Sequence, residues 1–372
     1  MKKIAIVHDW MITVGGAEKV LKQFMILYPT ATVFCMINKL TPQEEQSLLL
    51  HDKAKNLSLL NRFPLIKKNY RFYIPIFYKQ IEQFDFSEYD FILSSSHSIA
   101  KNIKTSPNQL HICYCHTPIR YVWNMKKTYL QQLPLIVRGL AMRQISKIKK
   151  WDYEGAQKVS HFIANSHFIA DRIAQNYGRT STVIHPPVNA DFYQLPENLI
   201  RTKKSFLVVS RLVHYKKIDL IIEAFNAMPD LELVVIGTGP QENDLHERAG
   251  DNIQFLGFQP AAVVREYMQE STAVLMAAIE DFGITSLETQ ACGTPVIAFN
   301  YGGYKESVVN KVTGLLFQDQ TSSSIIQAVR SFKENEHSFD RKAIRAHAEK
   351  FSNERFQQEL NQFVNEKTAQ IR

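Results

Sequence analysis

Two series of short apolar segments, each alternating with stretches of helical periodicity, constrain this chain more than any other feature. The segments are rich in Val, Ile and Phe. Strands that are buried in a parallel sheet have this composition, and their alternation with helices is typical of βα units. We therefore predict an α/β fold with two doubly wound domains and a cleft between them. The predicted strands are 4–7, 31–37, 90–96, 110–116 and 161–166, then 205–210, 231–237, 253–258, 273–279 and 295–300, with helices at 17–27 and 218–225.

A proline-rich segment separates the two series. Residues 182–199, TVIHPPVNADFYQLPENL, contain three prolines and few periodic apolar residues, which is typical of a linker. A chain of 372 residues is also long enough for about two domains of roughly 150 residues each. We therefore predict Rossmann-like domains at 1–186 and 187–352. The tail, at about 353–372, has the pattern of a helix with a polar face and no strand partner.

Several protein classes are excluded by what the sequence lacks. The longest apolar runs resemble 273–279, far below the ~18 residues that span a bilayer. The first apolar stretch ends after four residues, before His8, which is too short for a secretory signal. We expect free thiols and a cytoplasmic location, because the four cysteines have no C-x-x-C spacing. They are Cys35, Cys113, Cys115 and Cys292.

The net charge of +8 is divided unevenly along the chain. Residues 1–186 hold 25 Lys and Arg against 12 Asp and Glu, whereas residues 187–372 hold 19 against 24. The stretches 53–81 and 91–151 contain no acidic residue. Such a surface fits a nucleic acid, an anionic membrane or a phosphorylated substrate. The interleaved aromatic and aliphatic residues favour a peripheral contact with an anionic membrane, and no nucleic-acid-binding motif is present.

The segment 133–148 carries part of this basic charge. Its apolar residues recur at helical spacing with bases between them. This fits either a helix at the membrane interface or a core-packed helix with a solvated basic face, and the sequence leaves both open. The apolar positions are Leu133, Ile136, Val137, Leu140, Ala141, Ile145 and Ile148, and the bases of 91–151 are Lys101, Lys104, Arg120, Lys126, Lys127, Arg138, Arg143, Lys147, Lys149 and Lys150.

The first predicted strand is followed by Gly15 and Gly16, which open a predicted helix. Paired glycines allow a close backbone approach, and the amides of a helix N-terminus bind anions. A plain tight turn explains the same residues equally well. No complete G-x-G-x-x-G fingerprint and no P-loop motif occurs, so a dinucleotide oxidoreductase is disfavoured.

Two cations follow the first strand of the second series. Arg211 and Lys216 lie five residues apart, before a predicted helix. An Arg fork and a Lys point charge together suit a phosphate group. Solvated surface cations are the alternative interpretation.

The stretch 280–298 has the most specific pattern in the chain. Glu280 stands at the end of a predicted strand, Gly283 permits a turn, and the following helix carries Glu288. The first amides of that helix would face a ligand at the strand ends. Glu288 lies more than one turn inside the helix, where a carboxylate is usually solvated. The helix is expected to end at Gly293, and Pro295 to begin the next strand.

These stretches resemble glycosyltransferase family 4, whose members are retaining enzymes of the GT-B architecture. The carboxylates eight residues apart, the Phe-Gly between them and ACGTPVIA look like the family's central pattern. SRLVHYKK, VIGTGP, IQFLGF and FIANSHFIADRI are similar to further family segments, in the family's order and over nearly the whole chain. Lys217 departs from the pattern, since many relatives carry Gly there. CYCHTPIRYVW, a less specific match, resembles members that assemble O-antigen or capsule chains, many of which use GDP-mannose.

The resemblance implies a role for each motif. It places the nucleotide sugar mainly on the second domain and the acceptor on the first, with the C-terminal helix crossing back to the first. Arg211 and Lys216 would stabilise the leaving diphosphate, Glu280 would orient the transferred sugar, and Glu288 would bind the ribose. The implied catalytic residues are Glu280, His116, Arg211 and Lys216; the donor-binding residues are Gly15, Gly16, Arg211, Lys216, Gly237, Gly239, Phe258, Asp281, Phe282, Gly283, Ile284 and Glu288; and the acceptor and sugar side holds His116, Asn165 and Ser166, with Gly302, Gly303 and Glu306 in a phosphate-side loop.

The implied reaction is hexosyl transfer with retention, by front-face displacement without a covalent intermediate. Because no D-x-D motif occurs, we expect no metal and no cofactor besides the nucleotide sugar. The favoured donor is GDP-mannose, and the favoured acceptor is a polyprenyl-diphosphate-linked or saccharide hydroxyl in bacterial surface polysaccharide synthesis, at the inner face of the plasma membrane. A UDP-sugar-dependent family 4 transferase, a GT-B sugar-nucleotide epimerase and a non-catalytic sugar-nucleotide-binding protein are the alternatives.

Overall fold

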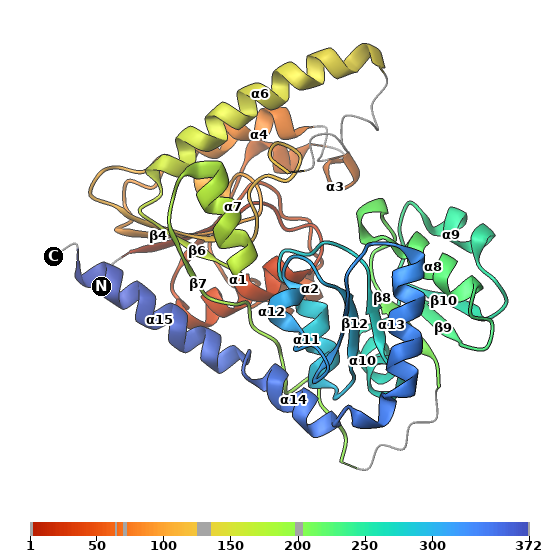
Figure 1. The fold of residues 1–372 in the computed structure, drawn as a ribbon. Helices are drawn as coiled ribbons and strands as arrows, with labels where there is room; N and C mark the ends of the chain where they lie inside the picture. The colour runs from red at the N-terminus through yellow and green to blue at the C-terminus, as the bar shows by residue number, and fades with distance from the viewer. Residues whose placement is uncertain (1–2, 64, 70–72, 125–134, 198–203, 371–372) are drawn as a thin grey trace. The chain divides into compact units, whose positions relative to one another are not determined.

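The chain forms two compact units in a computed structural model that describes residues 3–63, 65–69, 73–124, 135–197 and 204–370 (Figure 1). The first unit consists of residues 1–185 and 357–372, and the second of residues 186–356. Each unit is built on one sheet whose neighbouring strands are all parallel. The predicted α/β class with two doubly wound sheets is therefore confirmed.

The sheet of the first unit reverses its strand order at β1. The order is β3-β2-β1-β4-β5-β6-β7, so β1 has β2 on one side and β4 on the other. The sequence does not predict the edge strands β3 and β7, because KNL and STV are short and lack a hydrophobic run. The strands are β1 (Ile4–His8), β2 (Thr32–Cys35), β3 (Lys55–Leu57), β4 (Phe91–Ser96), β5 (Leu110–Cys115), β6 (His161–Ala164) and β7 (Ser181–Val183).

Apolar residues on one face of this sheet pack in two clusters, since Val7, Cys113 and Phe162 lie in one row of the strand register. One cluster joins Val7 and Ile92 to residues of the helical segments between β3 and β4, and another joins Phe162 to Ile169 and Ile173 of α7. The helices of this unit are α1 (Gly16–Leu27), α2 (Pro42–Ser47), α3 (Ile66–Asn69), α4 (Ile74–Gln80), α6 (Leu135–Lys158) and α7 (His167–Tyr177), with the 3-10 turns η1 (Leu59–Arg62), η3 (Ile81–Gln83) and η4 (Ala100–Asn102).

Helix α6 contains most of the predicted segment 133–148 and continues to Lys158. Ile148 is buried, and Ile145 packs against the same core cluster. The side chains of Arg143, Lys147, Lys149 and Lys150 are exposed. In its described part, the helix therefore has a core-packed apolar face and a solvated basic face. Leu133, Lys126 and Lys127 lie outside the described residues, as do the side chains of Ile136, Val137 and Leu140. None of the helices in the described ranges is long and apolar enough to cross a membrane.

A buried ion pair connects α6 to the 3-10 turn η4. Lys101 Nζ donates to Asp152 Oδ1 of α6 and to the Ser98 carbonyl. Trp123 Nε1 and Tyr177 OH donate to Asp152 Oδ2, at 2.8 and 2.7 Å. Removing one partner from such a buried pair typically costs about 3–5 kcal/mol, because a charge is left uncompensated.

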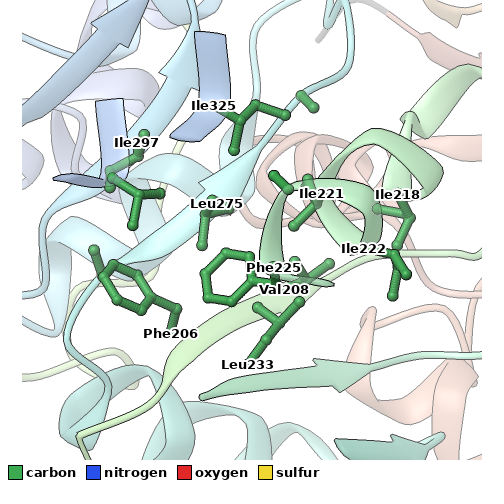
Figure 2. Packing of buried hydrophobic residues seen from close by; sticks show 14 of the residues in the cluster. Phe206, Val208, Ile218, Ile221, Ile222, Phe225, Leu233, Leu275, Ile297 and Ile325 are labelled. Atoms are coloured by element: carbon green, nitrogen blue, oxygen red, sulfur yellow. The ribbon is translucent and has the colours of Figure 1, made fainter. Parts of the chain in front are cut away.

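The second unit repeats the arrangement with six strands. The order β10-β9-β8-β11-β12-β13 reverses at β8. Residues of β8 alternate between faces: Phe206 and Val208 belong to one core cluster, and Leu207 packs in another. Figure 2 shows the first cluster, in which Phe206, Leu275 and Ile297 meet Phe225 and Ile221 of α8. The strands are β8 (Phe206–Val209), β9 (Leu233–Ile236), β10 (Ile253–Gly257), β11 (Val274–Met276), β12 (Val296–Phe299) and β13 (Gly314–Phe317).

Helices follow each strand of this unit. They are α8 (Ile218–Asn226), α9 (Glu242–Arg248), α10 (Ala261–Glu270), α11 (Ile284–Ala291), α12 (Tyr304–Ser307), α13 (Ser322–Glu334) and α14 (Arg341–Glu349), with the 3-10 turns η5 (His214–Lys216) and η6 (Glu336–Ser338). The sequence does not predict β13, because GLLF is only four residues long and follows a polar turn.

The C-terminal tail contains α14 and then α15 (Asn353–Ala369). Residues 357–372 belong to the first unit, which agrees with the expectation that the last helix crosses back to the first domain. Gln357 Nε2 donates to Gln23 Oε1 at 2.7 Å, and the Phe363 ring meets His161 edge-on at 6.3 Å between centroids.

Candidate functional site

Each sheet reverses its strand order between two strands whose carboxyl ends carry polar residues. Ligands of doubly wound sheets bind at this switch point. In the first unit, the reversal lies between β1 and β4, which end at His8 and Ser96. In the second unit, it lies between β8 and β11, which are followed by Arg211 and Glu280.

Asp9, the residue after β1, is fully buried and ties the ends of β1 and β4 together. Its carboxylate accepts hydrogen bonds from the four consecutive amides of residues 97–100, at 2.5–3.0 Å. His97 Nδ1 lies 3.1 Å from Asp9 Oδ2. Four amide donors satisfy a buried carboxylate, because hydrogen bonds to a charged acceptor are the strong ones. Asp9 therefore fixes the loop that carries His97.

Three further polar residues connect α1 to His116. Glu18 Oε1 lies 3.4 Å from His8 Nε2, His8 Nδ1 lies 3.0 Å from Ser95 Oγ, and Ser95 Oγ lies 2.8 Å from His116 Nε2. Burial raises the pKa of Glu18, but the hydrogen bond with His8 and the nearby histidines outweigh it, so the net shift is downward. Burial lowers the pKa of His116 well below its usual range, which keeps the ring neutral at pH 7.

The structure places the predicted residues of the first unit as follows. His116 directly follows β5, and Asn165 Nδ2 donates to its carbonyl oxygen at 3.0 Å. Ser166 caps α7 by accepting from the Ile169 amide at 3.1 Å, which is a capping role. The Gly15 amide already donates to Glu18 Oε2 at 2.8 Å. The prediction that the Gly15 amide contacts a phosphate does not include Glu18 as its acceptor. Gly16, the first residue of α1, is exposed.

In the second unit, Lys216 and Glu280 form an ion pair. Lys216 Nζ donates to Glu280 Oε1, and their side chains are 24% and 14% exposed. Lys216 ends η5, after β8, and Glu280 follows β11. A bridge between Glu280 and Gly302 and the hydrogen bond from Gly303 N to Glu280 O, at 2.8 Å, hold the Glu280 backbone. The structure therefore brings together two residues that are 64 positions apart.

Arg211 is exposed, and its guanidinium has no hydrogen bond or ion pair within the described residues. The backbone around it is packed against two glycines. A Cβ on Gly237 would lie 1.9 Å from the Ser210 carbonyl oxygen, and one on Gly239 would lie 2.2 Å from the Leu212 carbonyl oxygen. These glycines, which the resemblance assigned to donor binding, allow the β9 turn to approach the Arg211 loop.

Helix α11 begins at this end of β11. Gly283 precedes it with a φ of +86°, and the Tyr304 ring fills the space that a Cβ would need, at 2.6 Å. Asp281 and Phe282, just before the turn, are buried, and Ile284 is half-buried. Glu288 is 6% exposed, so it is not the solvated carboxylate that its position in the helix predicts. The N-terminus of α11 carries a partial positive charge beside Glu280.

Two arginines of α14 bind the opposite end of α11. Arg345 Nη1 donates to the Ala291 carbonyl at 2.8 Å, and Arg341 Nη2 and Nε donate to the carbonyls of Cys292 and Gly293, both at 3.2 Å. Cations at a helix C-terminus satisfy its last carbonyls and stabilise the helix dipole. They hold α11 with its N-terminus at the strand ends.

Phe258, predicted to bind the donor, follows the Gly257 turn at the end of β10 and is 77% exposed. The sequence interpretation gave no role to His8, Ser95 or His97. The signal was present as polar residues directly after apolar runs, in IAIVHDW and FILSSSHS. Such a run cannot show which of these side chains meet, because that depends on the strand order.

Known families and proteins match this chain over most of its length. Residues 14–192 match the family model described as Glycosyltransferase Family 4, and residues 192–351 match the one described as Glycosyl transferases group 1. The chain is 26% identical over 221 residues to a glycogen synthase of Mycobacterium tuberculosis, which covers 56% of this chain and 53% of that protein.

A second relative is the GDP-mannose-dependent monoacylated alpha-(1-6)-phosphatidylinositol monomannoside mannosyltransferase of Corynebacterium glutamicum. It is 30% identical over 194 residues, which are 44% of this chain and 51% of that protein. The matches thus span about half the length of these curated relatives. Among solved structures, Anabaena HepE in complex with UDP and glucose has a TM-score of 0.74 and 18% identity, over 98% of this chain and all of that one.

Proposed function

The chain belongs to glycosyltransferase family 4 and has the GT-B fold, and from this membership we propose that it transfers a hexose from a nucleotide diphosphate sugar to a hydroxyl acceptor. The reaction proceeds with retention of configuration and without a metal ion. The single observation that carries the proposal is the Lys216–Glu280 pair at the switch point of the second sheet, beside the N-terminus of α11.

The main barrier to such a transfer is negative charge on the departing diphosphate. Lys216, Arg211 and the first amides of α11 supply positive charge for it, and preorganised groups of this kind typically contribute about 10²–10³ in rate each. A diphosphate that binds Lys216 competes with Glu280 for the ammonium group. Glu280 is then released to accept hydrogen bonds from the sugar hydroxyls and to orient the sugar for front-face attack.

We favour GDP-mannose as the donor, because one of the two curated relatives described above is named as GDP-mannose-dependent. A uridine donor that delivers glucose is the second candidate, since the other relative is named a glycogen synthase. The acceptor we propose is a lipid-linked or saccharide hydroxyl of a bacterial surface polysaccharide.

The basic face of α6 supports peripheral binding to an anionic membrane. Arg143, Lys147 and Lys149 are exposed, whereas Ile145 and Ile148 pack into the core. The contact is therefore electrostatic and worth about 1 kcal/mol per base near the surface. Vesicle flotation should depend on anionic lipid and be lost at high salt, and flotation that ignores lipid charge would contradict this contact.

The proposal is tested by calorimetric titration with GDP-mannose, UDP-glucose and UDP-N-acetylglucosamine in EDTA, followed by transfer assays with the donor that binds. Glu280→Gln and Lys216→Gln should each lower kcat by about 10²–10³, and NMR of the product should show a retained anomeric configuration.

Lys217→Asn is the matched control for these variants. It removes the neighbouring charge, and Asn tolerates the left-handed backbone of that position, so its turnover should stay close to that of the parent. Normal turnover in Glu280→Gln, or activity that appears only with added divalent metal, would overturn the mechanism.

A further inference from the structure

The buried side chains of Glu18, His8, Ser95 and His116 form a continuous chain of hydrogen bonds in the first unit. Three of them are at most 7% exposed, and His116 is 9% exposed. The chain runs from α1 through the end of β1 and β4 to the residue after β5. Its links are 3.4, 3.0 and 2.8 Å long. Among these four residues, the family resemblance implies a catalytic role for His116 alone, and the proposed reaction gives the other three no role.

The donors and acceptors of this chain fix its direction. Glu18 Oε2 accepts from the Gly15 amide, and an ionised carboxylate can only accept. His8 then donates from Nε2, and in the ring tautomer with that single proton Nδ1 is an acceptor. The Ser95 hydroxyl then donates to His8 Nδ1, and its oxygen accepts from His116. His116 consequently carries its proton on Nε2.

We propose that Glu18, His8 and Ser95 are positioning residues that hold His116 as the neutral Nε2–H tautomer, with Nδ1 as a hydrogen-bond acceptor for a hydroxyl of the bound sugar. This step rests on the proposed transferase function. Nδ1 has no hydrogen-bond partner within the described residues of the chain. An acceptor nitrogen favours a hydroxyl, which can donate, over a phosphate oxygen, which cannot.

Strand β4, which carries Ser95, also contains a matched control for it. Ser94 Oγ lies 2.8 Å from His111 Nε2, the distance found between Ser95 and His116. His111 is 1% exposed and lies on β5 away from its carboxyl end. Ser94→Ala therefore removes an equivalent buried serine–histidine contact from the same sheet, without touching the chain that leads to His116.

Glu18→Gln gives the sharpest test, because it should reverse the donor and acceptor roles along this series of hydrogen bonds. The Gln oxygen must face the Gly15 amide, so its NH₂ group faces His8 and donates to Nε2. His8 then donates from Nδ1 to Ser95, Ser95 donates to His116 Nε2, and the His116 proton moves to Nδ1. If Glu18 had only a structural role, its substitution would not move the ring proton of His116, which is three hydrogen bonds away.

The experiment is ¹⁵N NMR of the full chain with labelled histidines at pH 8, with His116 assigned by comparison with His116→Gln. We expect the Nε2–H tautomer in the parent and in Ser94→Ala, the Nδ1–H tautomer in Glu18→Gln, and a mixture in Ser95→Ala. An Nδ1–H tautomer in the parent, an unchanged tautomer in Glu18→Gln, or a change in Ser94→Ala overturns the proposal. If Glu18→Gln does not fold, the parent and Ser95→Ala decide it.

A kinetic measurement tests the consequence for the sugar. Donor analogues in which one hydroxyl is replaced by fluorine cannot donate to Nδ1. For the hydroxyl that meets His116, the parent should lose up to about tenfold in kcat/KM with the fluorinated donor, the value of one hydrogen bond. Glu18→Gln should lose this discrimination. If no donor supports transfer, the proposed function is wrong. The tautomer of His116 still tests whether Glu18, His8 and Ser95 position its ring.

Discussion

The two switch points share a strand order but carry different chemistry. In the first unit, the polar side chains at the ends of β1 and β4 are buried and linked by hydrogen bonds, as Asp9 and Ser95 show. In the second, Lys216 and Glu280 are partly exposed ions, and the turns around them are shaped by glycine backbone. One topology can therefore orient a neutral group at one site and present charge at another.

Burial explains the difference. A histidine enclosed in a low-dielectric interior avoids charge, so its pKa falls. This holds for His97, His111 and His116 of the first unit, and burial lowers the pKa of His111 to about 3. Lys216 and Glu280 keep contact with water and pair with each other, so Lys216 can exchange this partner for an anionic ligand.

The largest expected effect follows from these histidines and is a loss of stability in acid. They protonate near pH 6.5 when unfolded but resist protonation when folded, so the unfolded state binds more protons below that pH and stability falls. Each ring contributes up to about 1.4 kcal/mol per pH unit below 6.5, or roughly 4 kcal/mol for the three together.

Tryptophan fluorescence reports this change in the first unit, because Trp10, Trp123 and Trp151 all lie there. Urea midpoints followed by fluorescence should drop steeply between pH 7 and 5, and circular dichroism should show whether the second unit follows. Removing one titrating ring, as in His111→Gln, should flatten the slope by about a third. A fluorescence midpoint that does not change with pH would contradict the expected protonation of these histidines on unfolding.

The sequence could predict the strands of both cores, because their apolar runs are long enough to stand out. It could also predict the positions of Arg211, Lys216, Glu280 and His116 at strand ends. It could not predict that Lys216 meets Glu280, since this pairing depends on β8 and β11 being neighbours. The buried state of Glu288 and the link from Glu18 to His116 were missed for the same reason: local pattern does not encode which distant side chains share an interior.

A second prediction tests the glycine-shaped backbone of the second unit. A Cβ on Gly303 would lie 2.1 Å from Phe282 Cα, so Gly303→Ala must displace the loop that holds Glu280. We expect a loss of about 3 kcal/mol in the free energy of unfolding and a lower kcat. Gly139→Ala, in α6, is the control, because nothing lies within 4 Å of its Cβ position, and it should be neutral or stabilising by up to about 1 kcal/mol. Equal stability of the two variants would show that the close approach is not needed.

The smallest effect concerns Lys217, at a motif position where many relatives carry Gly. Lys217 adopts a φ of 57°, in the left-handed region that favours glycine. Lys217→Gly should therefore stabilise the second unit by about 1 kcal/mol and raise its Tm by about 2–4 °C. Lys217→Ala keeps the steric cost and should give no gain, so differential scanning calorimetry of the two variants separates backbone strain from loss of charge. A similar Tm rise in both would assign the effect to charge, and would place the second switch point under electrostatic rather than conformational control.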